Sequence, residues 1–336
     1  MDDGRSQQNK PLAPRAVSGA QAATQNGAPP LKGPLFKRVT IIGVGLLGAS
    51  LGMALRAGAL AGHVTGVGRP GSESLKTALQ RGAVDEITTD LSQGAAGADL
   101  IILATNISAF PSAMNVLAEA SRPDCLITDV GSTKSEVMRM ARERLPNRCF
   151  VGSHPMAGSE KSGPENARAD LYRGALCLVV PPEDTVPAAG GHAGKATERI
   201  ITFWQALGMR THVLDSVTHD QWVAIVSHVP HLLAALMVNL TQDNPPSRMA
   251  AAGGFVDTTR VASGNVDMWT DILVSNRQAI KLQLLQIAEQ LDGLHAALDR
   301  NDAPAVRHWL SSAKAIRDQM LMDRGRQQSQ PAAIKH

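Results

Sequence analysis

A run of β-branched residues that ends in spaced glycines constrains most strongly what this chain can fold into. Residues Val39 to Ile42 form a continuous apolar run, and Gly43, Gly45 and Gly48 follow it in the string GVGLLG. Such a run predicts a parallel strand that is buried on both faces. The three glycines permit a tight turn, a close backbone approach to a ligand and close packing of the next helix on the strand. We therefore expect a helix N-terminus that binds the pyrophosphate of a dinucleotide.

The strand and helix pattern continues through the first half of the chain. Helix-like stretches such as SLKTALQRG and SEVMRMARERL separate further apolar runs at HVTGV, LIILAT, CLITDV, RCFVG and ALCLVV. This alternation predicts an α/β fold with a Rossmann-type, doubly wound parallel sheet. After a Pro/Gly-rich passage at 181–195 the pattern is mostly helical, apart from a strand candidate at MRTHVL. We expect one long helix from about Asp267 to Leu298 and a last one from about Val306 to Arg324.

The 336 residues predict about two domains with flanking segments. Residues 1–34 are rich in Gln, Ala, Pro, Gly and Ser, which is typical of a disordered N-terminal arm. We expect an NAD(P)-binding Rossmann-type domain at 35–195, a helical substrate and dimerisation domain at 196–326, and a flexible tail at 327–336.

Composition excludes several classes of protein. Aromatic residues make up only 3% of the chain and the net charge is +3 without a long basic run, so we expect no nucleic-acid partner. No uninterrupted apolar stretch reaches about 18 residues and no secretory signal begins the chain, so we expect a cytoplasmic protein without a membrane partner. Cys125, Cys149 and Cys177 lie in apolar surroundings without a CxxC pair, which predicts reduced thiols and no metal site.

The end of the second predicted strand bears on the choice of cofactor. Gly68, Arg69 and Pro70 stand where an NAD-preferring domain usually carries an acid for the ribose hydroxyls. Arg69 could pair with a 2′-phosphate, although a solvent-exposed arginine would look the same in the sequence. We expect NADP to be accepted at least as well as NAD. The cofactor-binding candidates are Gly43, Gly45, Leu46, Leu47, Gly48, Arg69, Thr105 and Ser132.

Polar side chains follow two later strands. The segment TDVGSTKSE covers residues 128–136, and VGSHPMAGSEKSG covers residues 151–163. The carboxyl ends of parallel strands face the ligand crevice, so these side chains are placed for chemistry. His154 has a near-neutral pKa as a free side chain, which suits a general base.

Together these segments resemble the prephenate and arogenate dehydrogenase family, of the TyrA type. Five separated motifs occur in the family's order: the glycine turn, DVGSTK, HPMAGSE, SHVPH at 227–231, and GGFVDTTRVA with Met268 and Trp269 after it. The resemblance implies NAD(P)-dependent oxidative decarboxylation of a cyclohexadienyl substrate in tyrosine biosynthesis. Hydride leaves the ring carbon that bears the 4-hydroxyl, and loss of the ring carboxylate as carbon dioxide restores aromaticity. The products would be 4-hydroxyphenylpyruvate or tyrosine.

The resemblance also implies roles for particular residues. His154 would hydrogen-bond the substrate hydroxyl and take its proton, and Ser132 would orient this histidine and the nicotinamide. Glu160 would lie at the mouth of the site. Side chains near Ser159 could influence the choice between the keto acid of prephenate and the amino acid of arogenate, which the sequence does not decide.

The second half of the chain supplies the remaining substrate candidates. Arg260 would grip a substrate carboxylate, because guanidinium geometry allows a bidentate pair. Asp257 lies three residues earlier and could hold Arg260 on a shared helical face. His231 matches the family's substrate-side histidine, whereas His228 could equally be structural. Trp269 would either wall the site or belong to the core.

Two other functions fit a dinucleotide domain that precedes helices. A β-hydroxyacid dehydrogenase would rely on a catalytic lysine in the helical domain, and the His154 loop argues against it. A non-catalytic NAD(P)-binding sensor would not need Ser132, His154, His231 and Arg260 together.

The apolar stripe of the long predicted helix suggests a partner subunit. Its members are Ile272, Leu282, Leu285, Ile287 and Leu291. They would be buried in a homodimer, which the resemblance also implies, or would pack within one chain. Asn106 stands where relatives often have proline. We expect no appended regulatory ACT-type domain after the last helix, so any feedback by tyrosine would act at the active site.

Overall fold

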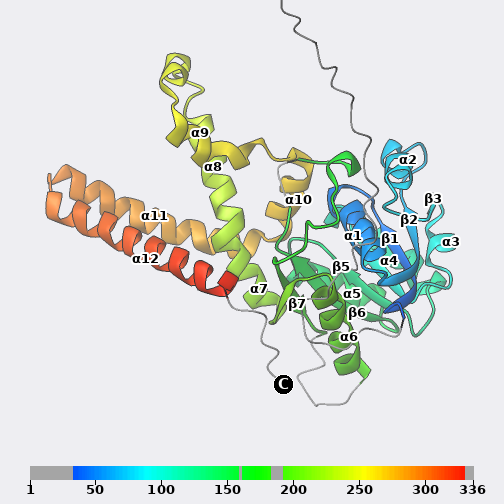
Figure 1. The fold of residues 1–336 in the computed structure, drawn as a ribbon. Helices are drawn as coiled ribbons and strands as arrows, with labels where there is room; N and C mark the ends of the chain where they lie inside the picture. Colours follow the sequence, from blue (N-terminus) through cyan, green and yellow to red (C-terminus); the bar gives the residue numbers. More distant parts are fainter. Residues whose placement is uncertain (1–32, 159–160, 183–191, 330–336) are drawn as a thin grey trace, which may run out of the picture. The chain divides into compact units, whose positions relative to one another are not determined.

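The computed structural model describes residues 33–158, 161–182 and 192–329 (Figure 1). Ser159 and Glu160, most of the predicted arm and most of the predicted tail lie outside the described residues.

An eight-stranded sheet with the order β3-β2-β1-β4-β5-β6-β7-β8 is the centre of the first half of the chain. Its strands are β1 (Phe36–Ile42), β2 (Ala61–Val67), β3 (Glu86–Thr88), β4 (Leu100–Leu103), β5 (Leu126–Asp129), β6 (Cys149–Pro155), β7 (Leu176–Val180) and β8 (Arg210–Val213). The Rossmann-type, doubly wound prediction is confirmed, and the crossover from β1 to both β2 and β4 creates the switch point where such folds bind ligands.

One pair of neighbouring strands departs from the expected parallel pattern. Strand β7 runs antiparallel to β6, with His154 opposite Leu178. Between these strands, the described residues 156–158 and 161–175 contain the short 3₁₀ helix η2 (Pro164–Asn166) and no crossover helix. Without such a helix the chain cannot return to the starting edge of the sheet, so β7 runs back beside β6.

Helices cover both faces of this sheet (Figure 1). One layer contains α1 (Leu46–Ala57), α2 (Glu73–Gln80) and α6 (His192–Ala206), and the other contains α3 (Leu91–Ala95), α4 (Phe110–Ala120) and α5 (Ser135–Arg144). Alternate strand residues supply the two cores, since Ile41 packs in the first and Ile42 in the second. Burial on both sides of central strands such as β4 and β5 explains why their sequences are continuous apolar runs.

The sheet extends beyond the expected domain boundary at residue 195. Strand β8 pairs in parallel with β7, which confirms the strand candidate at MRTHVL. In α6, Phe203 and Trp204 are completely buried in the same core as β1. We therefore propose that the first domain continues to about residue 214.

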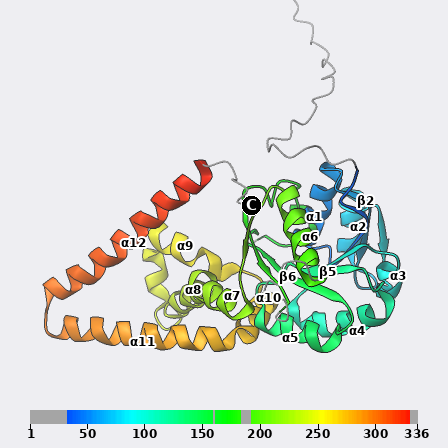
Figure 2. The same ribbon diagram turned by 90° about the horizontal axis from the view of Figure 1, so that it is seen from below.

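The remainder of the described chain is helical. It contains α7 (Ser216–Val223), the π-helix η4 (Ala224–His228), α8 (Val229–Asn239), η5 (Pro245–Ala250), α9 (Gly253–Thr259), η6 (Arg260–Ser263), α10 (Val266–Ser275), α11 (Arg277–Asp299) and α12 (Ala303–Ser329). Helices α11 and α12 project away from the sheet (Figure 2). A small apolar core joins η4, α8 and α11 through Ala224, Val229, Ala279 and Ile280.

The expectation of one helix from Asp267 to Leu298 was wrong, because α10 ends and α11 begins on either side of Asn276. This residue is buried, and its side-chain amide donates to the carbonyl of Asp220 at 2.8 Å and lies 3.0 Å from Nδ1 of His228. These long-range contacts hold Asn276 at the break, and the periodicity of the flanking residues does not reveal them.

One helical stretch, Ser216–Asn239, is long and apolar enough to cross a membrane by length and composition alone. Its mean hydropathy is 1.5, although the sequence showed no uninterrupted apolar run of that length. Four buried polar residues interrupt it: His219, Asp220, His228 and His231. The core helix of a folded domain passes the same test, and these polar side chains point to that explanation.

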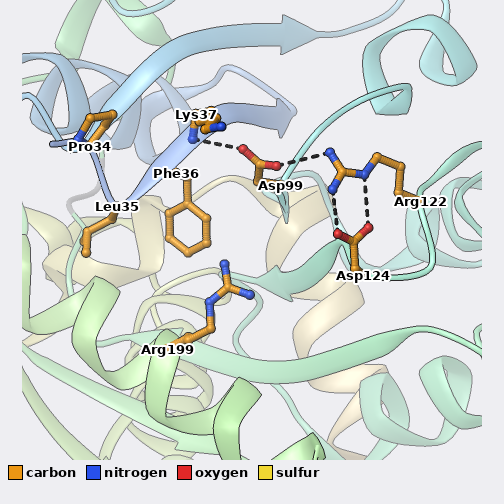
Figure 3. A pocket seen from close by; sticks show the side chains of 8 residues that line it. All are labelled: Pro34, Leu35, Phe36, Lys37, Asp99, Arg122, Asp124 and Arg199. Atoms are coloured by element: carbon orange, nitrogen blue, oxygen red, sulfur yellow. Dashed lines mark hydrogen bonds and ion pairs between the residues drawn. The ribbon is translucent and has the colours of Figure 1, made fainter.

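A shallow pocket at the amino-terminal ends of the strands contains a cluster of charges (Figure 3). Asp99 accepts hydrogen bonds from the backbone N–H groups of Lys37 and Arg38, and Arg122 joins Asp99 to Asp124. This cluster fixes the start of β1. The cluster lies at the opposite end of the strands from the glycine turn. Ligands of such folds bind at the carboxyl ends of the strands, so this cluster has a structural role.

Candidate active site

The glycine turn has the geometry that each glycine was expected to need. Gly43 adopts φ +96°, and a Cβ there would lie 2.7 Å from the carbonyl oxygen of Ala104. A Cβ on Gly48 would lie only 2.0 Å from the carbonyl oxygen of Gly43, so α1 can approach β1 only because this residue has no side chain. Beside Gly45 the space is open, with no atom within 4 Å of the corresponding position.

The start of α1 is suited to an anion. Gly45 is its N-cap and supplies no side-chain hydrogen bond to the first turn, which begins with Leu46 and Leu47. Uncapped N–H groups at a helix start attract negative charge. Thr105 follows β4 and places its methyl group next to Gly43. The open space and the uncapped helix fit a dinucleotide pyrophosphate.

Arg69 lies at the adjacent end of β2. Its side chain is exposed, and within the described ranges it makes no hydrogen bond or ion pair. Gly68 and Arg69 follow Val67, the residue that pairs with Ile42 at the end of β1. Arg69 therefore lies just beyond the end of the strand where folds of this kind carry the ribose-binding residue.

A completely buried ion pair shapes the loop after β5. Lys134 Nζ donates to Asp129 Oδ2 at 2.8 Å and to the carbonyl oxygens of Gly131 at 2.7 Å and Thr133 at 3.1 Å. Asp129 also accepts from the backbone N–H of Gly131 at 2.8 Å and of Ser153 at 2.9 Å. All three ammonium protons have partners, and the loop and β6 are tied to the same carboxylate.

His154 lies in β6 immediately after Ser153 and is 8% exposed. Its Nδ1 is 2.9 Å from Nε2 of His219. Burial, with smaller contributions from His219, Lys134 and His228, lowers the pKa of His154 well below 6.5. The lowered pKa favours a neutral imidazole, in which one ring nitrogen carries the proton and the other can accept one.

The hydrogen-bonding partner of His154 differs from the one expected. Ser132 is half-buried, and among the described residues no hydrogen bond joins it to His154. His219 makes that contact instead, from α7, sixty-five positions further along the chain. The expected orienting role of Ser132 toward the histidine therefore has no hydrogen bond to support it here. Its proximity to the cofactor stays a prediction.

Asp220 connects this histidine pair to the rest of the fold, and the sequence did not single it out. Its Oδ1 lies 2.8 Å from Nδ1 of His219 and accepts from the backbone N–H of Lys134 at 2.7 Å. Its Oδ2 accepts from the backbone N–H of Ser135 at 2.9 Å. The available signal was an adjacent His–Asp pair in a helical segment of high mean hydropathy.

His228 and His231 form a second group of rings with Trp269. The rings of His231 and Trp269 stack with centroids 3.6 Å apart, and His228 meets the same indole edge-on at 6.2 Å. Burial lowers the pKa of His228 to about 4 and also lowers that of His231. His228 Nε2 and His231 Nδ1 are buried and lack a hydrogen-bond partner in the described part of the chain. Two orphaned polar atoms beside one indole are consistent with a place for polar groups of a ligand.

The structure places the remaining candidates in less detail. Arg260 begins η6 and is exposed, and η6 packs against α8, the helix that carries His231. Asp257 is exposed on α9. In the described ranges no group of three His, Cys, Asp or Glu side chains is arranged to hold a metal ion. The three cysteines are free thiols, as expected, although Cys149 is only half-buried.

Comparisons with known proteins match both halves of the chain. The nucleotide-binding domain of prephenate dehydrogenase matches residues 51–211, and its dimerization domain matches residues 215–312. The chain is 31% identical to a prephenate dehydrogenase of Lactococcus lactis over 297 residues, which cover 86% of this chain and 79% of that protein. It is also 31% identical to a cyclohexadienyl dehydrogenase of Zymomonas mobilis over 290 residues, with coverage of 84% and 95%.

Solved structures give the same result. Prephenate dehydrogenase from Aquifex aeolicus, in complex with hydroxyphenyl propionate and NAD+, superposes with a TM-score of 0.77 at 27% identity, covering 84% of this chain and 98% of that one. Arogenate dehydrogenase from Synechocystis superposes with a TM-score of 0.70 at 28% identity, with coverage of 84% and 99%.

The glycine turn generates a paired prediction. Gly45→Ala should fold normally but bind NADH several-fold more weakly, because the new methyl group enters the open space at the helix start. Gly48→Ala should instead lower the free energy of unfolding by about 1–3 kcal/mol, because its methyl group collides with a backbone carbonyl. Thermal unfolding and calorimetric titration with NADH separate the two effects. Gly293→Ala, at an open position on α11, is the control and should change neither cofactor binding nor the fold. Wild-type NADH affinity in Gly45→Ala would contradict the assignment.

Proposed function

Because this chain belongs to the prephenate dehydrogenase family, we propose that it converts prephenate or arogenate by oxidative decarboxylation at the site around His154. The chain is an NAD(P)-dependent oxidoreductase of the tyrosine-biosynthesis dehydrogenases. The observation that carries the proposed site is a buried, neutral His154 with one nitrogen held and the other free.

The chemistry requires a base for the 4-hydroxyl proton of the substrate. His154 Nε2 accepts that proton while the C–H bond at the same ring carbon breaks. The bound nicotinamide supplies the acceptor for the hydride. The bond to the ring carboxylate then breaks, its electron pair completes the aromatic ring, and carbon dioxide leaves. A well-placed base contributes roughly 100- to 10,000-fold to such a step.

The cofactor site extends from the glycine turn to the end of β2. The backbone of Gly45, Leu46, Leu47 and Gly48 would hold the pyrophosphate, and Thr105 and Ser132 would flank the nicotinamide side. Gly68, Arg69 and Pro70, which directly follow β2, include no carboxylate to repel a 2′-phosphate, and the exposed Arg69 guanidinium can pair with one. These features support acceptance of NADP as well as NAD.

The substrate carboxylates require fixed positive charge. Arg260 would grip one of them, with Asp257 nearby on the preceding helix. His231 and Trp269, stacked on each other, would form the wall of the site. Ser159 and Glu160 remain candidates for the mouth of the site and for the choice between prephenate and arogenate.

The two alternative functions lose their support. The described chain has a buried lysine, Lys134, but it lies in the Rossmann-type half and is fully hydrogen-bonded, so it is not the helical-domain lysine of a β-hydroxyacid dehydrogenase. A non-catalytic sensor would leave the buried His154 pair without a purpose.

We further propose that the protein is a cytoplasmic homodimer. Of the stripe identified in the sequence, Ile272 and Ile287 pack within the chain, whereas Leu282, Leu285 and Leu291 are exposed. Leu282 and Leu285 line a shallow groove with Trp222 and Ile225, and polar side chains, among them Gln283, Gln286 and Glu289, complete its lining. A second copy of this surface would remove these side chains from water, and the matching family domain is described as a dimerization domain.

Replacing His154 by asparagine tests the function. The wild-type protein, given prephenate or arogenate with NAD or NADP, should produce reduced cofactor, and His154→Asn should lose at least about 100-fold in kcat with little change in KM.

Since the pKa of His154 is lowered, the wild-type kcat should persist below pH 6.5 and fall only as the buried imidazole finally becomes protonated. Steady-state absorbance kinetics across pH measure both. An inactive wild type on both substrates would refute the proposal.

The cofactor proposal predicts the behaviour of Arg69→Ala. If Arg69 pairs with the 2′-phosphate, this variant should raise KM for NADP several-fold and leave KM for NAD nearly unchanged. Arg56→Ala, on the neighbouring helix and already paired with Asp85, serves as a charge-matched control. A strong preference of the wild type for NAD, measured as kcat/KM, would remove Arg69 from this role.

The dimer proposal predicts a particle of two 35.4 kDa chains by light scattering at micromolar concentration. Leu285→Glu should weaken the dimer, because a carboxylate cannot be buried in an apolar interface without a partner. Val116→Glu, a similar change on α4 of the Rossmann-type half, should leave the particle mass unchanged. A monomeric wild type would overturn the proposal.

A further inference from the structure

Three side chains form a continuous hydrogen-bonded chain behind the proposed base. The contacts are His154 Nδ1 to His219 Nε2 at 2.9 Å and His219 Nδ1 to Asp220 Oδ1 at 2.8 Å. All three residues are buried, and the His219 side chain is completely inaccessible to solvent. Water therefore cannot supply or remove protons freely along this chain.

The positions of the protons follow from the end of the chain. Burial alone would raise the pKa of Asp220, but hydrogen bonds from His219 and from the N–H groups of Lys134 and Ser135 outweigh it and lower the pKa. An ionised carboxylate only accepts hydrogen bonds, so Nδ1 of His219 carries the proton that it donates. A neutral His219 then has a bare Nε2, which must accept from Nδ1–H of His154.

We propose that His219 and Asp220 are positioning residues for the reaction, because together they fix His154 in the tautomer with a bare Nε2. This inference rests on the proposed function, in which that nitrogen takes the hydroxyl proton of the substrate. When the substrate O–H bond breaks, the proton binds to Nε2 of His154. The positive charge that results is stabilised by the Nδ1–H bond to His219, whose own ring is polarised by the Asp220 carboxylate.

Neighbouring charged and titratable groups also influence the pKa of His154 and His219. Burial is the main cause that lowers the pKa of both His154 and His219, and Lys134 adds to it in both cases. Asp220 and Asp129 oppose this lowering for His219, whereas His228 adds to it for His154. The ammonium of Lys134 is paired with Asp129 at 2.8 Å. Asp220 is the carboxylate in direct contact with the His154–His219 pair, so we expect the positions of the protons on these two rings to depend on it.

Asp220 also has a structural role, because its carboxylate accepts from the first N–H groups of α5. A test of the positioning role must leave that structural role in place. Changing Asp220 would disturb both functions. His219→Phe removes the hydrogen bonds of the His219 ring to His154 and Asp220 but keeps an aromatic ring in the buried position. The Asp220 carboxylate can still accept from the N–H groups of Lys134 and Ser135. His219→Gln restores a polar group whose carbonyl can accept from Nδ1–H of His154 and whose amide can donate to Asp220.

In steady-state kinetics, His219→Phe should lose roughly 100-fold in kcat while KM stays within about twofold, and His219→Gln should recover part of that loss. His63→Phe, which replaces a histidine at the start of β2, should retain wild-type activity. Thermal unfolding of each variant shows whether the fold survives. A kcat of His219→Phe within about threefold of the wild type would overturn the proposal.

Nitrogen NMR of the histidine rings in the unliganded full-length protein tests the same point without turnover. We expect the His154 signals, identified by their loss in His154→Asn, to report a protonated Nδ1 and a bare Nε2. In His219→Phe the proton should redistribute toward Nε2. A wild-type His154 with its proton on Nε2 would refute the inference whether or not the protein is active. The expected tautomer in a protein that oxidises neither substrate would leave the inference standing and refute the proposed function.

Discussion

The buried ion pair between Asp129 and Lys134 is the interaction on which the rest of the site depends. Removing two charges from water is costly, and the pair is tolerable only because each charge is fully hydrogen-bonded. Lys134 satisfies two carbonyl oxygens of its own loop, and Asp129 holds the backbone of Gly131 and Ser153. Loss of one partner from such a pair typically costs about 3–5 kcal/mol. The residue after Ser153 is His154, so the same carboxylate that stabilises the loop holds the backbone next to the proposed base.

The two halves of the described chain meet at this loop. Asp220 accepts from the N–H groups of Lys134 and Ser135, where α5 begins, and a hydroxyl contact joins Thr133 to Ser275 at 3.0 Å. The carboxylate from α7 occupies the positive end of α5, which favours negative charge. The site is therefore assembled from the Rossmann-type half and the helical half together, and its geometry depends on the junction as much as on either part.

Local physical rules explain how much of this arrangement the sequence could reveal. The role of Gly48 was predictable, because the conflict between a side chain and the preceding strand lies within six residues. The position of His154 at the end of a strand was also predictable, because the apolar run that precedes it is local. The pairing of His154 with His219, the break at Asn276 and the reversed direction of β7 were not predicted. Each depends on contacts between distant segments or on a missing crossover helix, neither of which leaves a periodic signal.

Asp220 influences more rings than the one it contacts. Its carboxylate directs the proton of His219 and, through it, that of His154. Its backbone carbonyl accepts from the side-chain amide of Asn276, which identifies that atom as nitrogen, and the same nitrogen lies 3.0 Å from Nδ1 of His228. Nδ1 of His228 must then be an acceptor, so the proton of its neutral ring is on Nε2. That nitrogen is the buried atom beside Trp269 that has no hydrogen-bond partner among the described residues, and it is a hydrogen-bond donor. One residue at the junction thus determines a bare nitrogen on His154, which can take a proton, and a protonated nitrogen on His228, which can donate one in a hydrogen bond.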